Sequence, residues 1–240
     1  MKKQSKLVIM VLSLVFVIGL TGFTMAKSNN MMTGGNQTKG AVTAFQKIVK
    51  AYPKSVGFHK ALSHWGFKLK SGEKFEWTKD LSANKVDFAM VLMADQFTKA
   101  GLDVKKLDKN LWIYKPTEVE AGVKLPNRLI MALNVSDKRK FSMGSVDALK
   151  VILNQNTDLV QYYKKEGHYM LMLGDGYEVH WTDKLGSKAA DIEFVVKAQA
   201  LVKAGLDVKK LAASGWKFEA AGTGDSGKNA DQIVKEFRLK

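Results

Sequence analysis

The nine-residue segment KAGLDVKKL occurs twice in the chain, as Lys99–Leu107 and as Lys203–Leu211. The two occurrences lie 104 residues apart, and the same offset aligns residues 42–136 with residues 146–240 without a gap. About 25 of these 95 aligned positions are identical, more than chance gives over an ungapped span. The sequence therefore predicts a tandem duplication of a unit of about 95 residues, with a basic linker at 137–145. Two copies are too few for a solenoid, which needs at least three.

Hydrophobic periodicity predicts the same elements in each unit. Apolar residues spaced three and four apart over 42–52 predict an amphipathic helix, which Pro53 ends, and a second helical stretch is expected as far as Leu62. Alternating residues on both sides of Ser71-Gly72 predict a hairpin with a glycine turn. Further strands are expected at Asp87–Met93, Trp112–Lys115, Leu129–Val135, Asp191–Val196, Trp216–Glu219 and Ile233–Leu239, and N-caps at Asp103, Ser145 and Asp207. This order predicts an α+β fold, with N-terminal helices packed on a mostly antiparallel sheet.

The N-terminal segment 1–26 has the pattern of a secretory signal peptide. A lysine-rich start is followed by an uncharged apolar run and by Thr24-Met25-Ala26, whose small residues suit signal peptidase. An uncleaved membrane anchor is the alternative, because 20 uncharged residues can cross a bilayer. The polar, aperiodic segment 27–41 is expected to be a flexible lead-in. The sequence thus predicts a secreted or cell-envelope protein, in contact with a membrane only if this N-terminal segment is left uncleaved.

Composition excludes several classes of protein. The 240 residues are 46% hydrophobic and 25% charged, which is typical of a globular protein rather than a disordered one. Cysteine is absent, so disulfide scaffolds, thiolate metal sites and cysteine nucleophiles are ruled out. The formal net charge is +15, and a basic protein of this kind favours anionic partners.

The basic charge is concentrated in the first unit, which has 16 basic and 9 acidic residues against 14 and 13 in the second. The hairpin lysines Lys68, Lys70 and Lys74 are the candidate ligand-binding residues, because the second unit lacks a lysine at all three positions. The whole chain has only three arginines, whereas arginine supplies the bidentate contacts that read nucleic-acid sequence. The expected partner is therefore an anionic cell-wall or extracellular polymer, and not a specific nucleic acid.

Aromatic residues give a second set of candidates. Trp65, Trp112 and Trp216 could form an exposed platform for a sugar or a hydrophobic ligand, and closing the sheet cores is their alternative role. Among the four histidines, His64 and His168 occupy equivalent positions and are weak metal-ligand candidates. They could face each other across a two-fold axis, or simply cap the preceding helix in each unit. No cofactor is expected.

No motif predicts catalysis. Gly222–Lys228 matches the spacing of a phosphate-binding loop, but Asn229 stands where Ser or Thr would bind Mg²⁺, so no nucleotide partner is expected. There is no G-x-S-x-G nucleophile elbow. The sequence therefore favours an exported, non-catalytic binding protein of the bacterial envelope. A self-assembling surface protein that pairs its edge strands and a metal-dependent hydrolase are the alternatives.

Overall fold

A computed structural model of the chain describes residues 31–33, 35–60, 64–78, 88–120, 122–133, 144–164, 166–174, 177–221 and 230–239. Several features expected from the sequence lie outside these residues: the signal segment 1–26, linker residues 137–143, Asp87 and the glycine-rich loop 222–228. Among the described residues, no helix is both long enough and apolar enough to span a membrane.

The described residues form an α+β structure. The helices are α1 (Gly35–Ala51), α2 (Ala94–Lys99), α3 (Ser145–Gln155), α4 (Ala198–Lys203) and α5 (Val208–Leu211), with the 3-10 helices η1 (Pro53–Ser55), η2 (Val104–Lys106), η3 (Thr157–Leu159) and η4 (Ala212–Ser214). The strands before α3 are β1 (Met31–Thr33), β2 (Val56–His59), β3 (His64–Lys68), β4 (Lys74–Thr78), β5 (Phe88–Met93), β6 (Ile113–Lys115), β7 (Glu118–Glu120), β8 (Val123–Leu125) and β9 (Arg128–Leu133). The strands after α3 are β10 (Val160–Tyr163), β11 (His168–Gly174), β12 (Tyr177–Thr182), β13 (Ile192–Lys197), β14 (Lys217–Glu219) and β15 (Gln232–Phe237).

Two antiparallel sheets of similar topology dominate the fold. The six-stranded sheet has the order β2-β3-β4-β5-β9-β6, and the seven-stranded sheet has the order β1-β10-β11-β12-β13-β15-β14. When β1 is set aside, each strand of one sheet has a counterpart in the other at the offset of 104 residues; β5 and β13, for example, match end to end. The arrangement is compatible with a two-unit α+β fold.

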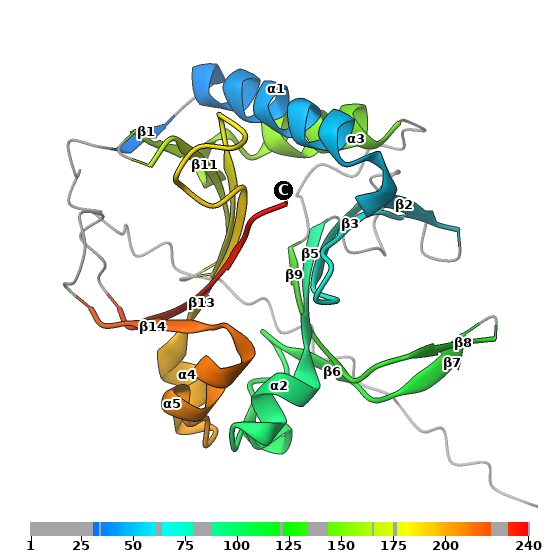
Figure 1. Cartoon of the computed structure of the whole chain (residues 1–240), viewed down its shortest axis with the longest axis vertical. Helices are drawn as coiled ribbons and strands as arrows, with labels where there is room; N and C mark the ends of the chain where they lie inside the picture. Colours follow the sequence, from blue (N-terminus) through cyan, green and yellow to red (C-terminus); the bar gives the residue numbers. More distant parts are fainter. Residues whose placement is uncertain are drawn as a thin grey trace, which may run out of the picture.

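The long helices α1 and α3 lie side by side across one end of both sheets (Figure 1). Each helix is held by the sheet of the other unit. The indole Nε1–H of Trp181 donates to the carbonyl of Ala41 in α1 at 3.0 Å. The equivalent residue of the first unit, Trp77, donates to Ser145 in α3 at 2.7 Å. Because the two bonds are equivalent at the same offset, the two units exchange helix contacts reciprocally.

The repeated segments meet at the opposite end of the molecule, where α2 lies beside α4 and α5 (Figure 1). The amide of Asp103 donates to the carbonyl of Ala204, and the amide of Asp207 donates to the carbonyl of Ala100, both at 2.8 Å. Gly101 has a φ of +97°, and a Cβ added there would lie 2.9 Å from the carbonyl oxygen of its equivalent glycine. Glycine is therefore required at this crossing both for conformation and for close approach.

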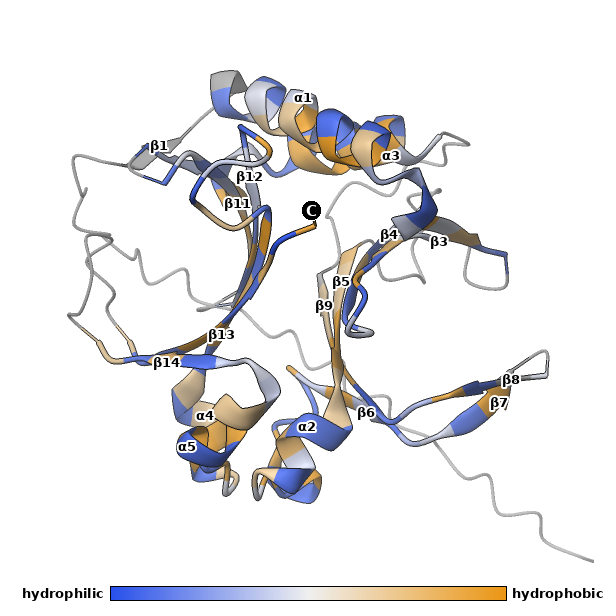
Figure 2. Cartoon of the chain, viewed as in Figure 1, coloured by the Kyte–Doolittle hydropathy of each residue, from blue (hydrophilic) through white to orange (hydrophobic). Residues whose placement is uncertain are grey.

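One hydrophobic core joins the two units. Phe45 of α1 contacts Phe75 and Trp77 of the first sheet as well as Trp181 of the second. Hydrophobic and hydrophilic residues alternate around α1, as an amphipathic helix over a core requires (Figure 2). The strand positions that alternate with these aromatic residues point to the other side of each sheet, which we call the outer face.

Several sequence predictions are confirmed. The hairpin forms between β3 and β4, and Gly72 in its turn has a φ of +104°. The strands predicted after it occur as β5, β6 and β9 and as β13, β14 and β15. Asp103 and Asp207 cap the following helical turns, because the carboxylate of each accepts the backbone N–H two residues later.

Other predictions differ from the structure. Residues Val56–His59 form β2, and the equivalent residues form β10, where a helical stretch was expected. Helix α1 begins at Gly35, so part of the expected lead-in 27–41 is helical, and β1 adds a further strand beside β10. Ser145 is the first residue of α3, and Gly144 occupies its N-cap position. The hairpin β7–β8 was not expected from the sequence.

Candidate functional site

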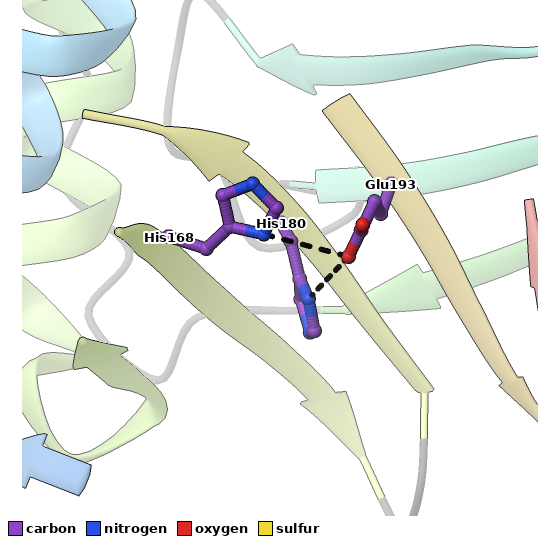
Figure 3. Close-up of side chains that lie close together, drawn as sticks. All are labelled: His168, His180 and Glu193. Atoms are coloured by element: carbon purple, nitrogen blue, oxygen red, sulfur yellow. Dashed lines mark hydrogen bonds and ion pairs between the residues drawn. The ribbon is translucent and has the colours of Figure 1, made fainter. Parts of the chain in front are cut away.

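A buried polar cluster occupies the outer face of the seven-stranded sheet, where three neighbouring strands each contribute one residue. His168 begins β11, His180 lies in β12 and Glu193 lies in β13 (Figure 3). His180 and Glu193 are directly paired across the strands, and His168 is offset from His180 by two positions. Side chains at such positions share one face and lie within reach of one another. The sheet register therefore brings all three together.

The two histidines converge on one carboxylate oxygen. Nδ1 of His168 lies 3.5 Å from Oε2 of Glu193, and Nδ1 of His180 lies 3.2 Å from the same atom (Figure 3). Each of the three residues offers one ligand atom, and these atoms lie within 4.8 Å of one another. In the part of the chain that the structure describes, this is the one group of three potential metal ligands so close together.

The remaining ring nitrogens have defined partners. Nε2 of His168 lies 2.8 Å from the carbonyl oxygen of Ala190, and Nε2 of His180 lies 2.6 Å from Oε2 of Glu178. Since a carbonyl oxygen only accepts, Nε2 of His168 carries a hydrogen and donates it. In the neutral ring, Nδ1 of His168 then carries a lone pair, and that buried atom has no hydrogen-bond partner.

Carboxylates dominate the electrostatics of this cluster. Burial would lower the pKa of His180, but hydrogen bonds with Glu178 and Glu193 and their negative charges outweigh it and raise the pKa to about 9. Burial would raise the pKa of Glu193, but the two histidines hold it well below its usual value. The two carboxylates therefore favour a positive charge on the His180 ring.

The equivalent face of the first unit has different chemistry. His64 is retained, but Glu76 stands in place of His180 and Ala89 in place of Glu193. His64 Nδ1 lies 3.9 Å from Glu76, whose carboxylate also forms an ion pair with Lys74. Burial would raise the pKa of Glu76, but His64 and Lys74 lower it to about 2. This carboxylate is already neutralised within the protein.

The three hairpin lysines differ in how far they are buried. Lys68 and Lys70 are exposed, whereas Lys74 is half-buried in its ion pair with Glu76. A second histidine does lie close to His168. Its neighbour is His180 of the same unit, with ring centroids 6.3 Å apart.

The tryptophan candidates lie mostly in the core. Trp112 and Trp216 are each only 2% exposed, so neither ring offers a platform to a ligand. Trp112 packs edge-on against Tyr177, and Trp216 packs edge-on against Phe97. Both contacts join the first unit to the second, which explains why a large ring is needed at each position. Trp65 is half-buried and packs against Phe58, with the ring planes tilted by 52° and the centroids 4.9 Å apart.

A buried ion pair also joins the units. Nζ of Lys235 donates to Oε1 of Glu73 at 2.5 Å and to Oε1 of Gln96 at 3.1 Å. The Glu73 side chain is fully buried and that of Lys235 is 8% exposed. Burial would raise the pKa of Glu73, but the hydrogen bond from Lys235 leads the contacts that lower it. At the equivalent positions the protein has Tyr177 and Met131, so this pair exists on one side of the interface only.

Sequence reasoning identified His168 but missed His180 and Glu193. It gave weight to residues that recur in both units, and these two do not recur. The signal that could have found them is the strand alternation, because His180 precedes the core residue Trp181 and Glu193 precedes the core residue Phe194. Both positions are therefore on the same outer face as His168.

Comparisons of the chain with protein-family models, with curated proteins and with solved structures find no match in any of the three. The chemistry of the sites themselves is therefore the basis for the function.

Proposed function

We propose that the protein is an exported, non-catalytic binding protein of the bacterial envelope or extracellular space, and that its first unit engages an anionic polymer. The observation that carries this proposal is a group of exposed lysines at one end of the six-stranded sheet. We call Lys50, Lys54, Lys68 and Lys70 the lysine cluster. The lysine cluster suits a flexible polyanion. Lysine provides mobile point charges, whereas the guanidinium group of arginine provides a rigid set of donors.

The strand register gathers the lysine cluster. Val56 of β2 pairs with Phe67 of β3. Lys54, in the 3-10 helix just before β2, therefore lies at the same end of the sheet as Lys68 and Lys70. Lys50 is in the last turn of α1, one helical turn earlier in the chain. Four positive charges thus gather around one corner of the first unit.

The acids of the same hairpin do not compensate these charges. Glu73 is buried and paired with Lys235 of the second unit, and Glu76 is buried and paired with Lys74. Among the described residues, no ion pair forms with Lys68 or Lys70. An acidic polymer approaching this corner would therefore meet a positive potential.

The second unit lacks this cluster. Its equivalents of Lys50, Lys54, Lys68 and Lys70 are Asn154, Asp158, Met172 and Gly174. We infer that the two units arose by tandem duplication, on the gapless repeat and on strand orders that correspond at the same offset. After the duplication the first unit kept or gained the polymer-binding corner, while the second unit diverged toward the histidine cluster.

The test is binding to immobilised poly(glycerol phosphate), an anionic polymer without bases or rings, at several salt concentrations. Reversing all four lysines of the cluster to Glu is expected to weaken binding at least roughly tenfold at low salt. The matched control reverses four exposed lysines of the second unit, Lys184, Lys188, Lys203 and Lys209. It changes the net charge by the same amount.

Equal losses in the two variants would show that only total charge matters and would contradict the proposal. Failure of the unaltered protein to bind would contradict it too. The export part is tested by N-terminal sequencing of the protein from its host, which is expected to begin at Lys27.

A further inference from the structure

We propose that His168, His180 and Glu193 form a binding site for one divalent transition-metal ion of the zinc type. The site lies on the outer face of the second unit and is separate from the lysine cluster of the first. It does not depend on the polymer-binding proposal.

The separations between the three residues suit a tetrahedral ion. Zinc bonds of about 2.0–2.2 Å to nitrogen and oxygen place neighbouring tetrahedral ligands about 3.3–3.6 Å apart. Here the two Nδ1 atoms lie 3.5 and 3.2 Å from Oε2 of Glu193. A small adjustment of side chains already in place would therefore bring all three onto one ion.

The outer contacts of both histidines are those that a metal site needs. A ligating histidine usually donates its second ring N–H to a carbonyl or carboxylate, which fixes the ring and leaves the other nitrogen for the metal. His168 donates in this way to Ala190, and His180 faces Glu178. Each ring thus has its Nε2 occupied and its Nδ1 directed at Glu193.

One ring nitrogen of His168 is in position to bind a cation. Nδ1 of His168 is buried, accepts no hydrogen bond and faces a carboxylate oxygen. With Nε2 donating to Ala190, a neutral ring sets a lone pair against a negatively charged oxygen, which is repulsive unless Nδ1 takes up a proton or a metal ion. A cation between these atoms converts the repulsion into two bonds.

Glu166 is a candidate fourth ligand. Its Oε2 lies 3.7 Å from Nδ1 of His168, and its side chain is 48% exposed. His168 itself is fully buried. This carboxylate or a water would complete four-coordination.

The donor set selects the class of ion. Two imidazole nitrogens and a carboxylate suit zinc and its neighbours among the first-row ions, whereas Mg²⁺ and Ca²⁺ prefer oxygen ligands alone. The first unit provides an internal comparison, because Ala89 replaces the carboxylate and Lys74 already neutralises Glu76. We therefore expect one ion per chain.

The test uses untagged protein titrated with Co²⁺, which gives intense visible absorption when it is tetrahedral, followed by displacement with Zn²⁺. We expect one equivalent of Co²⁺ with that absorption and its loss on addition of Zn²⁺. His168→Gln should weaken binding roughly 100-fold or more. The matched control, His64→Gln, alters the equivalent residue of the first unit and should leave the affinity unchanged.

A second measurement does not depend on a buried variant folding. X-ray absorption of the zinc-loaded unaltered protein should show two imidazole ligands with bonds of about 2.0–2.1 Å. Uptake far below one equivalent, a spectrum without imidazole scattering, or equal losses in the His64 and His168 variants would each overturn the proposal.

Discussion

Strands β11, β12 and β13 place His168, His180 and Glu193 together on the second unit, whereas the equivalent positions of the first unit hold His64, Glu76 and Ala89. The backbone register is the same in both places. Two differences in sequence therefore separate a carboxylate that is paired with Lys74 from a cluster of two histidines and a carboxylate. The shared fold fixes where side chains gather, and individual residues decide the chemistry at each place.

The largest effect is expected at the interface, where only one side has an ion pair. Lys235→Met leaves Glu73 buried without its cation, which should cost about 3–5 kcal/mol of unfolding free energy. Adding Glu73→Tyr restores the uncharged combination of Met131 and Tyr177 and should recover most of the loss. Denaturant titrations of the single and double variants measure both values. A loss below about 1 kcal/mol in the single variant would show that the pair does not couple the units.

The next effect concerns the pH dependence of the unfolding free energy. The outer faces of the two sheets should change it in opposite directions as the pH rises. The pKa of His180 is raised to about 9 by Glu178 and Glu193, against about 6.5 in the unfolded chain. Its contribution is fully present below pH 6.5 and is lost as the pH rises through 9, on the order of 3 kcal/mol. Glu76, with its pKa lowered to about 2, contributes above about pH 4 and loses that contribution in acid.

Thermal unfolding in the presence of a chelator, measured from pH 3 to pH 10, tests this contrast. In His180→Gln the alkaline loss should disappear while the acid loss remains. The groups that face His180 are Glu178, Glu193 and His168. If the alkaline loss persists unchanged in the variant, another group is responsible for it.

The smallest effect should come from giving Trp112 the hydrogen-bond partner that only Trp216 has. Trp216 donates its indole N–H to Gln96 at 2.9 Å, whereas the buried indole N–H of Trp112 has no partner among the described residues, because Ala200 replaces the glutamine. A cavity of about 190 Å³ is lined by Ala200 and Tyr177. Ala200→Gln should therefore stabilise the protein by about 1 kcal/mol.

The same Ala200→Gln substitution in a Trp112→Phe background provides the control. It removes the donor, so the gain should vanish there. Equal gains in both backgrounds would assign the effect to filling of the cavity rather than to the hydrogen bond.

Local pattern was enough to predict much of the fold. Gly72 between alternating runs identified the hairpin, and Asp103 and Asp207 identified their caps, because turns and caps are decided by neighbours in the chain. Strand β2 was missed because it is short and its exposed centre gives no alternation. The contact of Trp77 with Ser145 joins residues 68 apart, and no local pattern reports such a partner.

In the candidate sites too, some features could be predicted from the sequence and others depend on contacts between distant residues. Lys68 and Lys70 could be singled out because charge differences between the units are visible in the sequence. The burial of Trp112 and Trp216 could not, since it depends on packing between units rather than on either unit alone. His180 and Glu193 were missed because recurrence was the criterion, and the cluster consists of residues that the other unit lacks.

The reciprocal bonds from Trp77 to α3 and from Trp181 to α1 have a consequence for cutting the chain. A break between residues 133 and 144 would give two fragments. The N-terminal fragment would lack α3, which packs on its sheet, and the C-terminal fragment would lack α1, which packs on its own. Neither fragment then has a complete core, so folding becomes a bimolecular reaction whose yield depends on concentration. In the intact chain the linker keeps these two mutually dependent halves together, so folding does not depend on concentration.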